Sequence, residues 1–216
     1  MKKILMFLLL FTTVSFVFAQ KSSETYKQTI QKRADKIVAA LNLTDSSKFR
    51  KVSHIVADQY EDLNDVYIWR DSSYNKIKRE NTNNKELITK KKADVDSSVK
   101  KKIGKLHTSY LKHLSKQLNP DQVDDVKNGM TYNVANITYK AYQDMIPTLT
   151  EEQKKQLWVW LVEARENAMD AESSDKKHAW FGKYKGRINN YLSAQGYDIQ
   201  KERKGWEDRI KSSKSK

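Results

Sequence analysis

The sequence predicts an all-α fold, a single-domain helical bundle in which two long helices form a projecting basic hairpin. Only two prolines occur among the 216 residues. Apolar residues recur at steps of three and four rather than in alternation, which is the spacing of one helical face. In addition, Asn119 and Thr150 are each followed three residues later by glutamine, a pattern that starts helices.

The N-terminus reads as a secretory signal peptide over residues 1–19. Lys2 and Lys3 precede an apolar run, and Val17-Phe18-Ala19 offers a cleavage site. The run is shorter than the ~20 apolar residues that span a bilayer, and no later stretch is apolar enough to do so. We therefore expect a periplasmic or secreted protein without a transmembrane anchor in its mature form. Because the chain has no cysteine, its stability must come from a packed core.

The charge balance favours an anionic partner. Without Lys2 and Lys3 the chain has 39 basic and 27 acidic residues, a net charge of +12. Outside the cytoplasm such an excess suits an acidic polysaccharide, lipopolysaccharide or a phospholipid surface, whereas nucleic acid is not expected. The alternative is a basic surface that only contacts water.

The first half of the chain is expected to contain a short helix followed by the hairpin. The apolar positions of the short helix are Tyr26, Ile30, Ala34, Ile37 and Leu41. The two long helices are predicted over 45–80 and 85–118, separated by the break Asn81-Thr82-Asn83-Asn84. Residues 72–102 contain ten Lys or Arg and four Asp or Glu, a net charge of +6. This segment is either an arm that contacts an anionic envelope surface or a solvated helix pair.

The second half is expected to contain shorter helices. The helix that begins at Pro120 should end at Asn128-Gly129, because glycine readily adopts the left-handed closing conformation. An irregular stretch over 130–137 and a helix over 138–145 should follow. Further helices are expected from Thr150 to Ala171, from Ser173 to Gln195-Gly196, and over 199–210. The single domain is thus predicted over 20–211, with a disordered tail over 212–216.

The most informative stretch is His178–Leu192, which combines aromatic rings, cations and amides more densely than any other window. On a helix, Trp180, Tyr184 and Ile188 share a face that is most simply core. Gly182 and Gly186 each cost about 1 kcal/mol relative to alanine in a helix. They predict a flat patch that either a ligand or another helix approaches.

An acidic sugar is the ligand that these residue types suit best. Aromatic rings can stack on it, amides can bind its hydroxyls, and arginine can hold a uronate carboxylate bidentately. The candidate ligand-binding residues are Trp180, Lys183, Tyr184, Arg187, Asn189 and Asn190, with Tyr139, Tyr142, Glu163, Arg165 and Glu166 as second walls.

An enzymatic alternative uses the same cluster for β-elimination on uronates. Arg187 or Lys183 would neutralise the carboxylate, His178 would act as base and Tyr184 as acid. Hydrolysis by Glu163 and Glu166 is a weaker variant. Whether any bond is broken stays open.

The residues do not favour cofactor or metal chemistry. The chain has no cysteine nucleophile, serine elbow or glycine-rich phosphate loop. Glu163, Glu166 and Asp170 share a helical face and, with His178, could hold a metal. A solvated row that pairs with Arg165 and nearby lysines is the simpler interpretation, so we expect no metal and no cofactor.

Several motifs resemble the bacterial domain of unknown function 3826. They are IVADQY (55–60), MTY (130–132), TYKAY (138–142), DMIPTLT (144–150), EARE (163–166) and HAWFGKYKGRINNYLSAQGYD (178–198). The resemblance implies an exported protein of Bacteroidetes-like bacteria, often found alongside polysaccharide-degrading machinery. It implies no known reaction, so no catalytic residue is carried over from it.

A weaker similarity concerns the helix starts at Leu118-Asn119 and Leu149-Thr150, which resemble the LTxxQ signature of Spy-type periplasmic chaperones. It implies a third possibility, a chaperone-like or envelope-binding protein. Taken together, the sequence favours an exported helical protein that recognises or processes acidic polysaccharide or its oligosaccharides.

Overall fold

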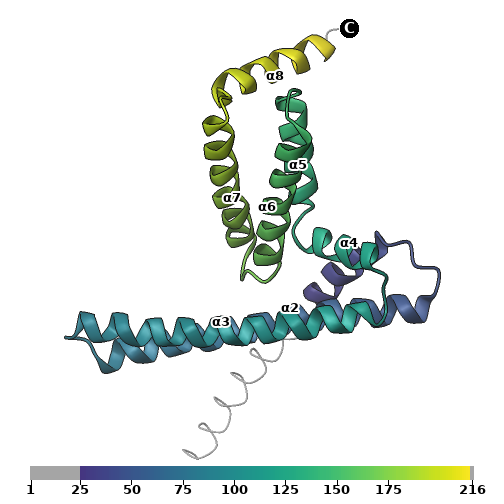
Figure 1. Ribbon diagram of the computed structural model, residues 1–216. Helices are drawn as coiled ribbons and strands as arrows, with labels where there is room; N and C mark the ends of the chain where they lie inside the picture. Colours follow the sequence, from purple (N-terminus) through teal and green to yellow (C-terminus); the bar gives the residue numbers. More distant parts are fainter. Residues whose placement is uncertain (1–24, 215–216) are drawn as a thin grey trace, which may run out of the picture. The chain divides into compact units, whose positions relative to one another are not determined.

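A computed structural model describes residues 25–214, and these form helices joined by short turns (Figure 1). No strand occurs between residues 25 and 214, which confirms the all-α prediction. Within the same residues no helix is both long and apolar enough to cross a membrane. The predicted signal peptide, residues 1–19, lies outside the described residues.

The chain divides after Gln117 into two compact units. The first contains a helical segment over residues 25–39, α2 (Ser46–Glu80) and α3 (Lys85–Ser115). The second contains α4 (Pro120–Met130), α5 (Val134–Met145), α6 (Glu151–Met169), α7 (Ser174–Ala194) and α8 (Ile199–Lys214). Whether residues 20–211 form a single domain, as predicted, therefore depends on whether the two units fold independently.

In the first unit, α2 and α3 run alongside each other as the expected hairpin (Figure 1). Asp45 caps α2 by accepting from the amides of Ser47 and Lys48 at 2.7 and 3.1 Å, and Asn84 caps α3 by accepting from Leu87 at 2.9 Å. A cap oxygen satisfies amides that have no partner inside the helix. The predicted boundaries of both helices are therefore confirmed to within three residues.

Packing in this unit is concentrated away from the hairpin tip. Ile30, Ala34 and Val38 of the first helical segment are buried, and its Gln31 side chain donates to the Ser53 hydroxyl of α2 at 2.8 Å. Between residues 64 and 98, by contrast, no side chain is fully buried. That part of the hairpin is therefore held together by partly buried side chains and by polar contacts between α2 and α3.

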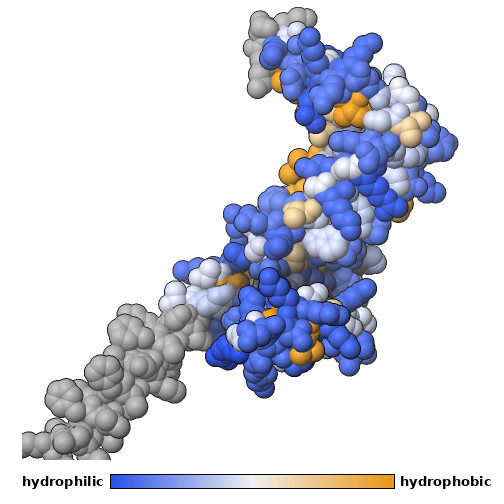
Figure 2. Space-filling view, turned by 90° about the vertical axis from the view of Figure 1, so that its left-hand side faces the viewer, coloured by the Kyte–Doolittle hydropathy of each residue, from blue (hydrophilic) through white to orange (hydrophobic). Residues whose placement is uncertain are grey.

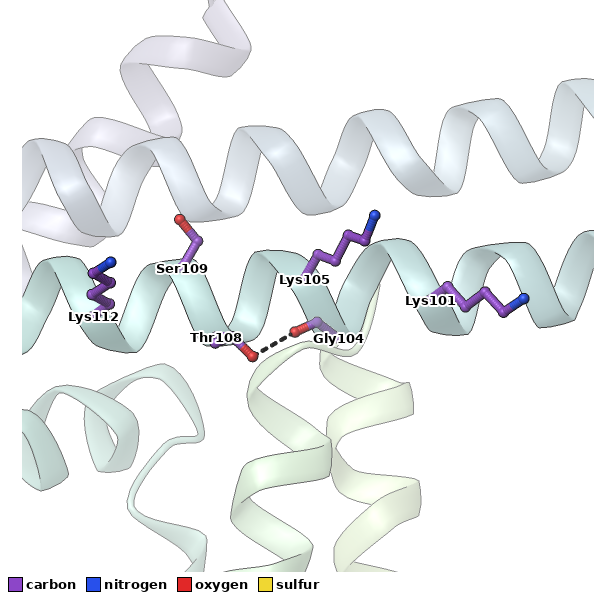
Figure 3. Close-up of a pocket in the computed structure, with 6 residues that line it drawn as sticks. All are labelled: Lys101, Gly104, Lys105, Thr108, Ser109 and Lys112. Carbon is purple, nitrogen blue, oxygen red and sulfur yellow. Dashed lines mark hydrogen bonds between the residues drawn. The ribbon is translucent and has the colours of Figure 1, made fainter.

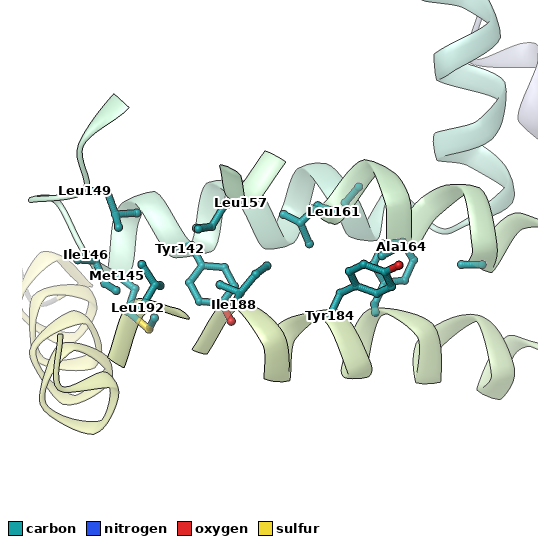
Figure 4. Packing of buried hydrophobic residues seen from close by; sticks show 13 residues of the cluster. Tyr142, Met145, Ile146, Leu149, Leu157, Leu161, Ala164, Tyr184, Ile188 and Leu192 are labelled. Atoms are coloured by element: carbon teal, nitrogen blue, oxygen red, sulfur yellow. The ribbon is translucent and has the colours of Figure 1, made fainter. Parts of the chain in front are cut away.

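In the second unit the core lies between α5, α6 and α7. Figure 4 shows Leu157, Leu161 and Ala164 of α6 facing the buried side chains of α7. Tyr142 and Met145 of α5 join the same cluster. The helical spacing of these apolar residues is what lets each helix present one continuous face to its neighbours.

The helix starts of this unit are confirmed in detail. At the start of α4 the Gln122 amide donates to Asn119 Oδ1 at 2.9 Å, and the glutamine side chain returns to the Asn119 amide. At the start of α6 the Gln153 amide donates to Thr150 Oγ1 at 3.2 Å, and the Thr150 amide donates to Gln153 Oε1 at 2.9 Å. Both pairs are capping boxes.

The predicted end of α4 at Asn128-Gly129 is wrong. The helix continues through Gly129 to Met130, and the left-handed positions are Tyr132 (φ 57°) and Asn133 (φ 56°). The Asn133 amide donates to the Asn128 carbonyl at 2.8 Å, which closes the helix by a Schellman motif with tyrosine where glycine is usual. The predicted irregular stretch over 130–137 is thereby reduced to three residues before α5.

The C-terminal boundary also differs from the prediction. Helix α8 extends to Lys214, into the tail expected to be disordered over 212–216. The Ser212 and Ser213 hydroxyls donate to the carbonyls of Asp208 and Ile210 at 2.9 and 2.8 Å, so the serines satisfy their own polar groups within the helix. Residues 215–216 lie outside the described residues.

Candidate functional site

Helix α7 carries the stretch singled out by sequence, and it buries a slightly different face than expected. Phe181, Tyr184 and Ile188 are buried, at 1%, 6% and 0% exposure. Trp180, predicted to lie in this core face, is only half-buried and packs at the edge of the cluster. The ring of Trp180 is therefore partly available to solvent.

The side of α7 nearest Trp160 of α6 brings cations onto aromatic rings. The Arg187 guanidinium lies over the Trp160 ring at 4.5 Å, and Nη1 is 3.5 Å from Glu163 Oε2. The Lys183 ammonium lies over the Trp180 ring at 5.3 Å. These five residues, Trp160, Glu163, Trp180, Lys183 and Arg187, are called the α6–α7 face below.

The α6–α7 face is open to solvent while resting on the core. The side chains of Arg187 and Glu163 are 53% and 51% exposed. Beneath them, burial and then a hydrogen bond to Glu163 raise the pKa of Tyr184 to about 12. Tyr184 is thus a neutral, buried support for Glu163 rather than a group that releases a proton at neutral pH.

The opposite side of α7 makes different contacts. The His178 ring stacks on Tyr132 with centroids 5.5 Å apart, and Asn189 Oδ1 accepts from the Tyr142 hydroxyl at 2.7 Å. Burial raises the pKa of Tyr142 to about 12. The hydrogen bond between Tyr142 and Asn189 therefore satisfies both polar groups and links α5 to α7.

The residues proposed for β-elimination are not brought together. His178 and Arg187 are nine residues apart on α7, which is two and a half turns and places them on opposite sides of the helix. Tyr184, the proposed acid, is buried beneath Glu163. His178, Tyr184 and Arg187 therefore do not converge on one point in the described structure.

The predicted second wall is also divided. Arg165 is buried at 2% exposure, and its guanidinium donates to Asp124 Oδ1 and Asn128 Oδ1 at 2.9 Å and to Glu166 at 3.2 Å. Lys127 Nζ is 3.2 Å from the same Glu166 oxygen. These contacts tie α6 to α4, and they occupy the polar atoms of Arg165 and Glu166.

The remaining candidates lie around these two clusters. Tyr139 packs against Trp158 with ring centroids 5.1 Å apart, and it is half-buried. Asn190 is exposed, three residues after Arg187. In the described part of the chain, no three acidic or histidine side chains gather as a metal site, and Glu163 and Glu166 pair with different arginines, Arg187 and Arg165.

Sequence reasoning missed Trp160. Its ring carries Arg187 on its face and Tyr191 at its edge, with centroids 5.2 Å apart in the second pair. A signal existed, because Trp160 precedes Glu163 by three residues and so shares its helical face.

The two glycines of α7 face open space. A Cβ atom built on Gly182 or Gly186 would meet no described atom within 4 Å. Packing of another helix against these glycines, one of the two predicted explanations, is therefore absent from the described structure. The space-filling view shows a largely hydrophilic face with only small separate apolar patches (Figure 2).

A comparison of the chain with curated proteins found no match. The family described as Protein of unknown function (DUF3826) matches residues 27–212, a span that includes both units and every helix of the candidate site. This agrees with the motifs noted in the sequence, from residues 55–60 to residues 178–198. The chain belongs to the family Protein of unknown function (DUF3826).

Proposed function

We propose that this protein binds acidic oligosaccharides on the α6–α7 face. The observation that carries the proposal is the position of Arg187, whose guanidinium carbon lies 4.5 Å from the centre of the Trp160 ring and within reach of Glu163. A planar guanidinium fixed in this way keeps hydrogen-bond donors along its edge and can hold a carboxylate bidentately. An aromatic ring beside it can pack against the apolar face of a sugar.

Glu163 does not prevent a ligand carboxylate from reaching Arg187. Both side chains are about half exposed, and their closest atoms are 3.5 Å apart. Exposed ion pairs of this kind contribute roughly 0–1 kcal/mol, so a uronate that binds both Arg187 nitrogens can replace the glutamate. Glu163 then acts as a competitor that sets the affinity.

A second cation–aromatic pair extends the same face. Trp180 and Arg187 are seven residues apart on α7, two turns that place them on one side of the helix about 10 Å apart. Lys183 lies between them along the chain, above Trp180. The face thus presents two aromatic–cation pairs in succession, which suits an oligosaccharide with more than one acidic sugar.

Titration calorimetry with oligogalacturonides tests the proposal. We expect binding in the micromolar to millimolar range, at least tenfold weaker binding by Arg187→Ala, and none to neutral oligosaccharides of equal length. Lys185→Ala is the matched control, because it removes an exposed positive charge from α7 outside the α6–α7 face. Equal loss in both variants would show that charge alone, rather than this face, is responsible.

Glu163→Gln gives a sharper test, since it removes the internal competitor but keeps the size of the side chain. We expect the variant to bind oligogalacturonides several-fold more tightly than the natural protein. Unchanged or weaker binding would contradict the idea that a ligand carboxylate takes the place of Glu163 beside Arg187.

We also propose that the protein acts outside the cytoplasm, in the periplasm or as a secreted protein, on the basis of the signal-like residues 1–19. Cell fractionation checks this directly. Full-length protein that keeps Met1 and stays in the cytoplasmic fraction would contradict it.

A further inference from the structure

The outward side of α3 carries an uninterrupted polar row. Lys101, Gly104, Lys105, Thr108, Ser109 and Lys112 line an open depression on this helix (Figure 3). All six are exposed. Their spacing of three and four places them along one strip of the helix surface, and Lys101 and Lys112 are about 16 Å apart along its axis.

The lysines of this row have no anionic partner in the described chain. Lys101, Lys105 and Lys112 take part in none of its ion pairs, whereas Lys27, Lys76, Lys127, Lys140 and Lys154 elsewhere all do. On the neighbouring helix α2, Glu61 forms its ion pair with Lys27. Three cations held in line without a counter-charge attract an extended anion.

The polar residues between the lysines point to the kind of anion. The exposed Thr108 hydroxyl donates to the Gly104 carbonyl at 2.9 Å, so its oxygen can still accept a hydrogen bond (Figure 3). The Ser109 hydroxyl is exposed beside it. Two hydroxyls between cations match a polymer that presents both hydroxyl and acidic groups, and the bare backbone at Gly104 lets such a chain approach closely.

A membrane surface suits the row less well. Helices that lie on membranes bury an apolar face in the boundary between headgroups and acyl chains. The row contains only lysine, glycine, threonine and serine, so it has no side chain to insert. A linear polymer needs no such insertion, because it can follow the strip along the helix axis.

We propose that the α3 row, Lys101 to Lys112, is a second binding surface that takes linear acidic polysaccharide. It lies in the other unit from the α6–α7 face and is independent of the function proposed there. Of the row, only Lys101 belongs to the basic segment 72–102 that the sequence predicted for an anionic surface, and the other five residues follow that segment.

The experiment compares two triple variants of the whole chain with equal loss of charge. One is Lys101→Gln, Lys105→Gln and Lys112→Gln, and the other is Lys78→Gln, Arg79→Gln and Lys85→Gln at the hairpin tip. Binding to polygalacturonate of high molecular mass is measured, with neutral dextran and vesicles of phosphatidylglycerol as further arms. Circular dichroism verifies that each variant keeps its helices, which is expected because every substituted side chain is exposed.

We expect the row variant to bind polygalacturonate roughly a hundredfold more weakly, at ~fivefold for each lysine removed. The tip variant should lose less than tenfold, and dextran should not bind. Equal losses in the two variants would overturn the proposal, as would binding to vesicles with none to polygalacturonate. Arg187→Ala in the same assay separates the two surfaces, because it should leave the polymer bound through α3 even if the α6–α7 face has no role.

Discussion

At the scale of single residues, the second unit uses its cations in two opposite ways. Arg165 and Lys177 are buried at 2% and 4% exposure, and Lys177 Nζ donates to the carbonyls of Met130 and Met169 at 3.1 and 3.0 Å. These carbonyls belong to the last residues of α4 and α6, where the helix dipole favours a positive charge. Arg187, by contrast, lies on the surface.

Sequence could not distinguish Arg165 from Arg187. Both stand near glutamates in helices rich in polar residues, and both were assigned to the ligand site. What separates them is a contact between segments distant along the chain: Arg165 meets Asp124 and Asn128 of α4, whereas Arg187 meets Trp160 and Glu163 of α6. The identity of such partners depends on how the helices pack, which local patterns do not encode.

The buried position of Arg165 predicts a large loss of stability on truncation. We expect Arg165→Ala to lower the free energy of unfolding by about 3 kcal/mol, because it removes a buried cation that binds three side chains. Arg187→Ala should cost less than about 1 kcal/mol, as its ion pair is exposed. Denaturant unfolding followed by circular dichroism measures both. Similar losses in the two variants would contradict the structural role assigned to Arg165.

At the scale of helices, the sequence predicts the helix ends correctly where the capping residues are of the usual types. Asn119 and Thr150 start α4 and α6 as predicted, and Gly196, with φ 92°, follows α7 at its expected end. The end of α4 was missed because a tyrosine occupies the left-handed position. A non-glycine residue adopts the left-handed conformation only at a cost in free energy, so residue propensities do not place a helix end at Tyr132. The stacking of Tyr132 on His178, a contact between residues distant along the chain, contributes stability that helps to offset this cost.

The exposed glycines of α7 make a prediction at the same scale. Gly182→Ala and Gly186→Ala should each raise the free energy of unfolding by about 1 kcal/mol, because alanine favours the helix and its Cβ meets no described atom. Gly196→Ala is the contrasting control, since its positive φ of 92° should make alanine destabilising there. Thermal unfolding compares the three variants. A loss of stability at Gly182 or Gly186 would mean that another part of the protein packs against that backbone.

At the scale of the whole molecule, charge is distributed unequally between the units. Residues 20–117 contain 22 basic and 12 acidic side chains, a net charge of +10, whereas residues 118–216 contain 17 and 15, a net charge of +2. The apolar cluster of α5, α6 and α7 lies entirely in the second unit. Total charge and helical class were predictable from composition and spacing, but the division after Gln117 was not, because no proline- or glycine-rich linker marks it.

This division predicts that the second unit folds on its own. A fragment of residues 118–216 contains the whole α5–α6–α7 core and every partner of Arg165, so it should be helical and unfold in one cooperative transition. A fragment of residues 134–216 lacks α4, including Asp124 and Asn128, and should be markedly less stable. Circular dichroism during thermal unfolding distinguishes them. A non-cooperative 118–216 fragment would instead support the single domain expected over 20–211, since its core would then require residues from the first unit.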